Sequence, residues 1–176
     1  VVRNILAELQ RTPPAGYNIC PVYGTKEGGF FYTDKFQLDA VDAVDAVGHA
    51  REGQAVTAGP GDLFLGLDLA AHLFPEAEPH LQAYRLAGAK VFYVVYDIIP
   101  LRYPQFTVQG MTDAFALWLR ALGRCADGLL CISDAVAQDV AAWLHAQAPA
   151  TAATAATAAA PLPHITHFHL GADVQN

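Results

Sequence analysis

The sequence has little positive charge. Ten lysines and arginines stand against seventeen aspartates and glutamates, which gives the 176 residues a formal net charge of −7 at pH 7. A protein that coats nucleic-acid phosphates presents a stripe of basic side chains. The sequence contains no such stripe, so we do not expect nucleic acid as a partner.

Long apolar runs and paired cysteines are also missing. No apolar segment reaches the roughly 18 to 20 residues that cross a bilayer as a helix. The three cysteines, Cys20, Cys125 and Cys131, are odd in number and have apolar neighbours. This pattern predicts buried free thiols in a reducing compartment rather than a disulfide framework, and hence a cytoplasmic protein.

Three nucleotide-binding and catalytic motifs are absent. Gly59-Pro60-Gly61 precedes a predicted strand, whereas a dinucleotide-binding Gly-x-Gly-x-x-Gly lies between a strand and a helix. No phosphate loop of the Gly-x-x-x-x-Gly-Lys type occurs. Ser133 lacks the Gly-x-Ser-x-Gly elbow of a hydrolase nucleophile, which excludes serine hydrolysis.

The most informative stretch that is present runs from Val91 to Pro104. Six uncharged residues, mostly β-branched or aromatic, lead directly into Asp97, and Pro100 follows three residues later. Such a run predicts a strand buried on both faces, as in a parallel sheet. Ligands of open α/β sheets bind beyond the carboxyl ends of the strands, which makes Asp97 a candidate site residue. The alternative is that Asp97 only caps the turn that Pro100 enforces.

Strand and helix patterns alternate along the chain. This order predicts right-handed crossovers and one Rossmann-like α/β domain over 1–176, with a doubly wound, mostly parallel sheet. The opening helix begins without a capping residue, so we expect the domain to be incomplete at its N-terminus. The stretch 148–163 is of low complexity and predicts a loop. The predicted strands are 17–23, 62–69, 91–96, 128–132 and 164–170, and the predicted helices begin near residues 2, 75, 111 and 134.

Two groups of polar residues have a ligand-binding and a structural interpretation. Arg102 and Tyr103 follow Asp97 closely; an arginine there binds phosphate or carboxylate, or it lies on the surface. Ser133 is a natural N-cap, beside backbone N–H groups that can receive an anion.

Two patterns resemble metal sites but predict no metal. On a strand, His167 and His169 share one face while His164 lies on the other, so only two ligands converge where zinc needs three or four. The aspartates at 39, 42 and 45 repeat every third residue, whereas a calcium loop places its oxygens every second residue.

Four blocks in order carry a family resemblance. They are 61–68 (Gly-Asp-Leu-Phe-Leu-Gly-Leu-Asp), 95–104 (Val-Tyr-Asp-Ile-Ile-Pro-Leu-Arg-Tyr-Pro), 126–140 behind a helix that contains Trp118, and 170–173 (Leu-Gly-Ala-Asp). Together they resemble the N-terminal domain of family 4 (group 1) glycosyltransferases, as found in bacterial enzymes that build lipopolysaccharide or capsule. These are retaining enzymes of the GT-B fold.

The resemblance implies the acceptor-binding half of a glycosyltransferase that uses a nucleotide-sugar and needs no cofactor. The acceptor would be a glycan or a lipid-linked glycan, and the partner would be the protein's own C-terminal donor domain, joined by a hinge that starts at 171–176. Peripheral association with the inner face of the membrane is compatible with such a role. The half alone is expected to be inactive. The implied site residues are Asp97 as the catalytic residue; Tyr96, Arg102, Tyr103 and Asp68 on the acceptor; and Ser133, Gly171 and Asp173 at the cleft and hinge.

Two departures and two alternatives accompany this interpretation. Many members carry histidine where this chain has Tyr96, and the family's glycine-rich loop would precede the opening helix. One alternative is half of another GT-B enzyme, such as a nucleotide-sugar epimerase. The other is a non-catalytic, flavodoxin-like interaction domain, although the lysine and paired acids of that class have no counterpart here.

Overall fold

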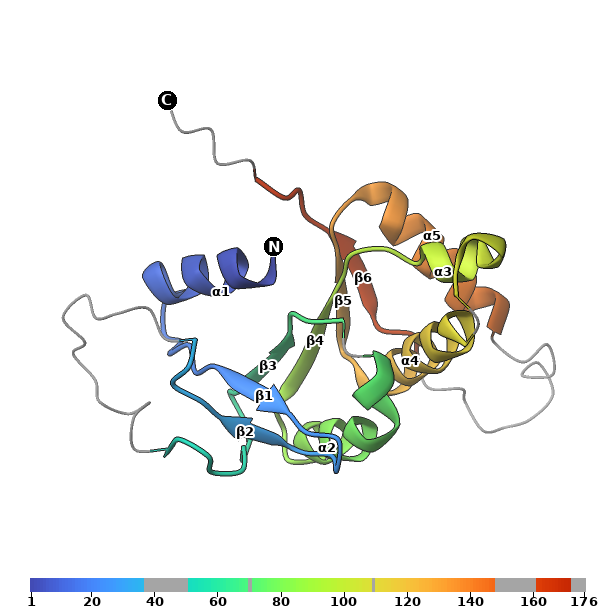
Figure 1. Cartoon of the computed structure of the whole chain (residues 1–176). Helices are drawn as coiled ribbons and strands as arrows, with labels where there is room; N and C mark the ends of the chain where they lie inside the picture. Colours follow the sequence, from blue (N-terminus) through green and yellow to red (C-terminus); the bar gives the residue numbers. More distant parts are fainter. Residues whose placement is uncertain (37–50, 70, 109, 148–160, 172–176) are drawn as a thin grey trace.

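A four-stranded parallel sheet forms the centre of the protein (Figure 1). The computed structural model describes residues 1–36, 51–69, 71–108, 110–147 and 161–171. The sheet has the order β3-β4-β5-β6, and every neighbouring pair in it is parallel. The predicted α/β class and the parallel, Rossmann-like sheet are confirmed. The strands are β3 (Leu63–Gly66), β4 (Lys90–Val95), β5 (Gly128–Cys131) and β6 (His164–His167).

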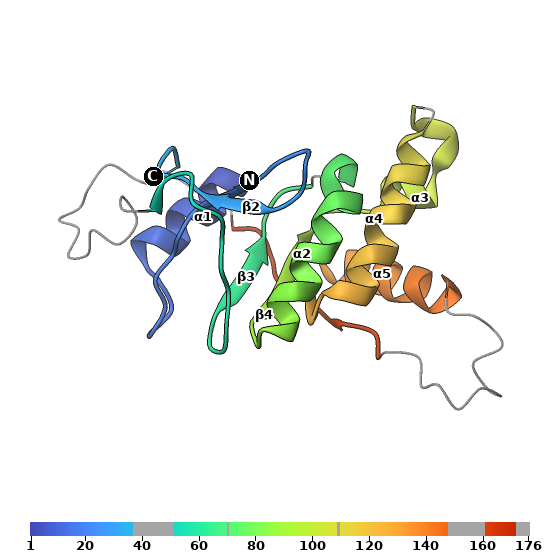
Figure 2. The ribbon, with the colours of Figure 1, turned by 90° about the horizontal axis from the view of Figure 1, so that it is seen from below.

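Helices connect the successive strands of the sheet. α2 (Phe74–Leu86), α4 (Met111–Cys125) and α5 (Asp134–Gln147) lie side by side on one side of the sheet, as both views show (Figures 1 and 2). The connection from β4 to α4 contains a short helix, α3 (Ile99–Arg102), and a 3-10 turn, η3 (Pro104–Phe106). A second 3-10 turn, η2 (Ala71–Leu73), precedes α2. The sequence predicted the long helices, but not α3 or the 3-10 turns.

The N-terminal residues form a separate group at the β3 end of the sheet (Figures 1 and 2). α1 (Val2–Arg11) is present as predicted, but none of its residues is fully buried. The predicted strand 17–23 is largely wrong, because pairing begins only at β1 (Val22–Gly24), whose partner β2 (Phe30–Tyr32) has three residues. The aspartates at 39, 42 and 45, most of the low-complexity loop and Asp173 lie outside the described residues.

The hydrophobic core lies between the sheet and the three long helices. Trp118 of α4 is fully buried and meets Phe74 and Phe115 edge to face, at ring-centroid distances of 6.5 and 5.8 Å. Val91, Tyr93, Val94 and Val95 of β4 are buried, which confirms a strand covered on both faces. Complete burial of one Val or Leu side chain stabilises a fold by about 1.5–3 kcal/mol relative to its exposure. The C-terminal end of β4 is therefore well anchored.

Aromatic rings of β4 lie over glycines of both neighbouring strands. Gly66 is paired with Tyr93, and a Cβ at Gly66 would come within 2.1 Å of the Tyr93 ring. Gly128 is paired with Phe92, and a Cβ there would come within 2.6 Å of that ring. Because the Tyr93 ring is buried, it has no room to move aside. Glycine at these two positions lets the sheet close around β4.

The three cysteines are free thiols, as the sequence predicts. Cys125 and Cys131 are buried, and burial raises their pKa values to about 12 and about 11, respectively. Cys20 is only half-buried. Among the described residues, none of the helices combines the length and apolar character that crossing a membrane requires.

Candidate functional site

Four of the predicted site residues lie at the carboxyl edge of the sheet. Asp68 follows β3, Tyr96 and Asp97 follow β4, and Ser133 follows β5. The strands are parallel and level with one another, since Val95 is opposite Cys131 and Cys131 is opposite His167. Four side chains from three separate stretches of the sequence therefore lie along one edge, where open α/β sheets bind their ligands.

Tyr96 links the ends of β4 and β3. Its hydroxyl donates a hydrogen bond of 2.8 Å to the backbone oxygen of Leu67, and Asp68 follows in the chain. Burial raises the pKa of Tyr96, and the negative charge of Asp68 raises it further. The phenol therefore stays protonated, and its oxygen keeps lone pairs that can accept a hydrogen bond from a ligand hydroxyl.

Asp97 caps the turn that follows β4. The backbone N–H of Ile99 donates a hydrogen bond of 3.0 Å to Asp97 Oδ1, which bears out the turn-capping interpretation of this aspartate. Within the described part of the chain, Oδ2 of Asp97 accepts no hydrogen bond. The turn fixes the position of the carboxylate and leaves one oxygen available to a ligand. A role of Asp97 in ligand binding stays a prediction.

Ser133 caps α5, as the sequence predicts. The backbone N–H of Val136 donates to Ser133 Oγ at 3.3 Å, and the N–H of Ala137 donates to the Ser133 carbonyl at 3.0 Å. Its hydroxyl oxygen thus satisfies one of the free N–H groups at the start of the helix.

A histidine pair lies close to this cap. The His167 and His169 rings meet edge to face at 5.5 Å, which confirms that they share one face, and His167 Nδ1 lies 3.7 Å from an Asp134 oxygen. The strand alternation indicated the pairing of the histidines, but nothing in the sequence pointed to Asp134. No group of three or more His, Cys, Asp or Glu within the described ranges is arranged to hold a metal ion.

Arg102 and Tyr103 lie on the surface beside α5. The Arg102 guanidinium forms an ion pair with Asp139 of α5 and lies 5.8 Å from the centre of the Tyr103 ring. Arg102 therefore lies on the surface, which was one of its two interpretations from the sequence. Its contact with an acceptor stays a prediction. Gly171 is exposed, and within the described ranges no atom beyond its chain neighbours would lie within 4 Å of a Cβ at this position.

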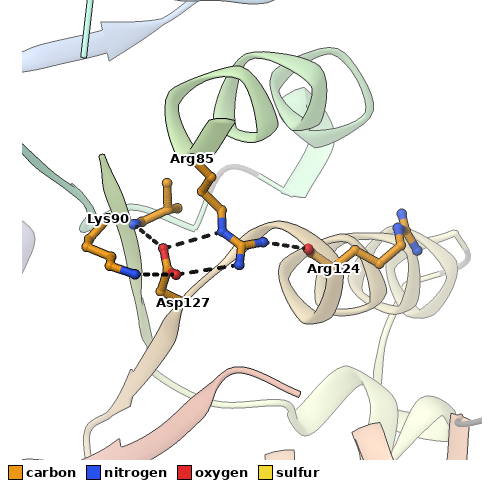
Figure 3. Close-up of polar contacts among 5 residues, drawn as sticks. Arg85, Lys90, Arg124 and Asp127 are labelled. Atoms are coloured by element: carbon orange, nitrogen blue, oxygen red, sulfur yellow. Dashed lines mark hydrogen bonds and ion pairs between the residues drawn. The ribbon is translucent and has the colours of Figure 1, made fainter. Parts of the chain in front are cut away.

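A second polar cluster lies at the opposite, amino edge of the sheet (Figure 3). The Asp127 carboxylate, which precedes β5, accepts hydrogen bonds from the backbone N–H of Val91 at 2.9 Å and from Lys90 Nζ at 3.3 Å. Arg85 Nε lies 3.4 Å from Asp127 Oδ2, and Arg85 also donates to the Arg124 carbonyl at 3.0 Å. Arg85, Lys90, Arg124 and Asp127 line a hollow of about 510 Å³.

Every charged side chain of the amino-edge cluster has an oppositely charged partner. Burial raises the pKa of Asp127, but the Val91 N–H and the positive charges of Arg85 and Lys90 outweigh burial, so the pKa is lowered from its ordinary value. Arg124 forms two hydrogen bonds to Glu78, of 2.7 and 2.8 Å, and this contact raises the pKa of Arg124. The amino-edge cluster therefore ties α2, α4, β4 and β5 together, and we assign it a structural role.

The structure defines an α/β, Rossmann-like domain with polar side chains along the carboxyl edge of its sheet. The chain is 34% identical over 174 residues to each of three curated sequences described as serotype-specific mannosyltransferase WbdA of Escherichia coli. The match covers 99% of this chain but only 19–20% of each relative, so the chain spans about a fifth of the length of these proteins. No protein-family model matches the chain, and no solved structure matches it.

Proposed function

We propose that this chain is the acceptor-binding part of a retaining glycosyltransferase that builds a bacterial surface polysaccharide. The observation that carries the proposal is the 34% identity to mannosyltransferases over 174 residues. The donor would be a nucleotide-activated sugar, with mannose favoured by the name of the relatives, and the acceptor would be a glycan or a lipid-linked glycan. The domain belongs, in this proposal, to a GT-B enzyme at the cytoplasmic face of the membrane.

The carboxyl edge of the sheet would hold the acceptor. Asp97 Oδ2 would accept a hydrogen bond from an acceptor hydroxyl and orient it, while the Tyr96 oxygen would accept a second. Asp68 and Tyr103 would contact neighbouring sugar hydroxyls. Arg102 would bind an acceptor phosphate if its guanidinium left Asp139 and paired with the phosphate instead. Ser133, Gly171 and Asp173 would face the cleft toward a donor domain. The donor diphosphate would be met mainly by that other domain, so this chain alone would transfer no sugar.

The substitution Asp97→Asn tests the proposed role of the free carboxylate oxygen. Asparagine keeps an Oδ1 that accepts the Ile99 N–H, so the turn and the free energy of unfolding should change by less than about 0.5 kcal/mol. Loss of a hydrogen bond to a charged oxygen should lower kcat/KM about 10- to 100-fold. The measurement is sugar transfer from nucleotide-activated mannose by the full-length gene product.

Asp62→Asn is the matched control. Asp62 also caps a turn, since Gly59 N–H donates to it at 2.9 Å, but it lies at the amino edge of β3. Transfer by this variant should equal that of the wild type. Unchanged kcat/KM in Asp97→Asn would remove Asp97 from the site, and a full-length protein that transfers no sugar from any nucleotide-sugar would refute the proposed function.

A further inference from the structure

The last strand of the sheet adds two histidines, His167 and His169, to the carboxyl edge. Cys131 of β5 is paired with His167, and the backbone N–H of Phe168 donates to the Cys131 carbonyl at 2.9 Å. This hydrogen bond carries the pairing beyond the end of β6, so in the same register His169 comes level with Ser133. The histidine pair therefore extends the row of polar side chains along this edge to the fourth strand.

The histidine pair is held in place from α5. His167 Nδ1 lies 3.7 Å from Asp134 Oδ1, and the other oxygen of Asp134 accepts a hydrogen bond of 2.6 Å from Gln138. The His169 ring meets the His167 ring edge to face at 5.5 Å. A carboxylate beside one ring nitrogen of a histidine favours the N–H on that nitrogen and fixes the orientation of the ring. Asp134 thus orients His167, and His167 supports His169.

The imidazole of His169 has unused hydrogen-bonding groups. The residue is exposed, and in the part of the chain that the structure describes its ring nitrogens make no hydrogen bond. A neutral imidazole has one N–H that donates and one nitrogen that accepts. This combination matches a hydroxyl group, because a hydroxyl also both donates and accepts.

The carboxylate beside the histidine pair favours an uncharged ligand over an anion. Asp134 lies in the first turn of α5, where its own charge already meets the positive end of the helix. Neither lysine nor arginine balances it, since its partners among the residues with described positions are His167 and Gln138. A phosphate that approached the histidine pair would be repelled by this carboxylate. A glycan carries hydroxyl groups without charge and meets no such repulsion.

The histidine pair lies too far from Asp97 to share one sugar with it. Asp97 follows β4, and β5 separates β4 from β6. Neighbouring strands are about 4.8 Å apart, so the ends of β4 and β6 are about 10 Å apart. This distance exceeds the width of a pyranose ring. If Asp97 orients the hydroxyl that reacts, His169 meets the hydroxyls of a sugar further along the same glycan.

We infer that His169, positioned by His167 and Asp134, binds a second sugar of a glycan that lies along the carboxyl edge of the sheet. The assignment of this glycan as the acceptor rests on the proposed function, whereas binding of a glycan at His169 does not. His169 contacts a sugar that does not react, so it contributes equally to the bound ground state and to the transition state. Its loss should therefore raise KM for a long acceptor and leave kcat unchanged.

Sugar transfer to acceptors of two lengths tests the inference. The full-length gene product is assayed with the methyl glycosides of mannose and of a mannose trisaccharide. His169→Ala should raise KM for the trisaccharide about five- to tenfold, because one or two hydrogen bonds are lost, and should leave KM for the monosaccharide unchanged. His169→Gln keeps a donor and an acceptor and should restore part of the loss. His167→Ala removes only the support of His169 and should raise the same KM by less.

His164→Ala is the matched control, because His164 is an exposed histidine at the opposite, amino end of β6. This variant should have the wild-type KM for both acceptors. An unchanged KM for the trisaccharide in His169→Ala, or an equal rise for the two acceptors, would overturn the inference. So would the same rise in His164→Ala. The urea denaturation midpoints of the His164 and His169 variants should stay that of the wild type, since both side chains are exposed.

Direct binding separates this inference from the proposed function. Calorimetric titration of the full-length protein with the trisaccharide measures its Kd without sugar transfer. A Kd that rises in His169→Ala, in a protein that transfers no sugar, would refute the proposed function and leave the glycan site intact. Sugar transfer with the same trisaccharide Kd in wild type and His169→Ala would do the reverse. Neither binding nor transfer would overturn both.

Discussion

Among the described residues, both oxygens of Asp127 at the amino edge of the sheet accept hydrogen bonds, whereas at the carboxyl edge only one oxygen of Asp97 does. Each carboxylate lies next to a strand of the central sheet: Asp127 precedes β5, and Asp97 follows β4. Asp127 is surrounded by Arg85, Lys90 and a backbone N–H and is largely buried, with 17% of its side chain exposed. The amino edge uses its charges for stability, and the carboxyl edge keeps polar atoms that a ligand can use.

The largest expected effect is on stability at the amino edge. Asp127→Ala removes the acceptor of the Val91 N–H and leaves Arg85 and Lys90 without their shared partner. We expect the free energy of unfolding in urea to fall by about 2–3 kcal/mol. Asp62→Ala, which removes one exposed turn contact, should cost no more than about 1 kcal/mol. Equal losses in the two variants would contradict the special role of Asp127.

A smaller effect is expected at the cap of α5. Ser133→Ala removes the acceptor of the Val136 N–H and should lower the free energy of unfolding by about 1 kcal/mol, as measured by urea denaturation. Ser133→Asn should restore most of that loss, because asparagine is an equally good N-cap. Equal losses of stability in Ser133→Ala and Ser133→Asn would show that the N-cap hydrogen bond of Ser133 does not contribute to the stability of the fold.

The smallest effect is expected from acid. The pKa of Asp127 is lowered in the folded state from its ordinary value of 3.8, so its contribution to stability is complete above that value and is lost as the pH falls through the folded pKa. The loss should be smaller than in Asp127→Ala, because a protonated carboxyl group still accepts the Val91 N–H.

Urea denaturation at a series of acidic pH values measures this effect, with Asp127→Asn as the reference. Asparagine is neutral throughout, so the variant should lose less stability than the wild type on acidification below about pH 4. Parallel curves for the two proteins would show that the ion pairs of Asp127 add nothing measurable.

The central part of the fold was predictable because its signals are local. The apolar run of β4 reflects a strand that is buried on two faces. The apolar residues spaced three and four apart from Met111 to Leu122 reflect a helix that is buried on one face. The cap at Ser133 was equally local, since serine and the N–H that it receives are three residues apart. The resemblance to glycosyltransferases rested on the same central blocks, and the identity to mannosyltransferases agrees with it.

The partners of the site residues were not predictable, because they lie far away in the sequence. Tyr96 reaches a carbonyl 29 residues earlier, and Arg102 meets a carboxylate 37 residues later. Asp127 has partners on α2 and on β4, and the spacing of residues along the sequence does not predict these contacts. The strand at 17–23 failed for a related reason: its aromatic and apolar residues fit a strand, but β2 offers only three residues to pair with.

The burial of two of the three thiols gives the protein an internal reporter. Cys125 and Cys131 lie in the core with pKa values near 12 and 11, so at neutral pH they are protonated and shielded from reagents. Cys20 is half-buried and is the thiol that a maleimide reaches first. A single fluorophore can thus be attached at Cys20 without engineering the sequence, and later uptake of reagent at the other two cysteines counts the molecules whose core has opened.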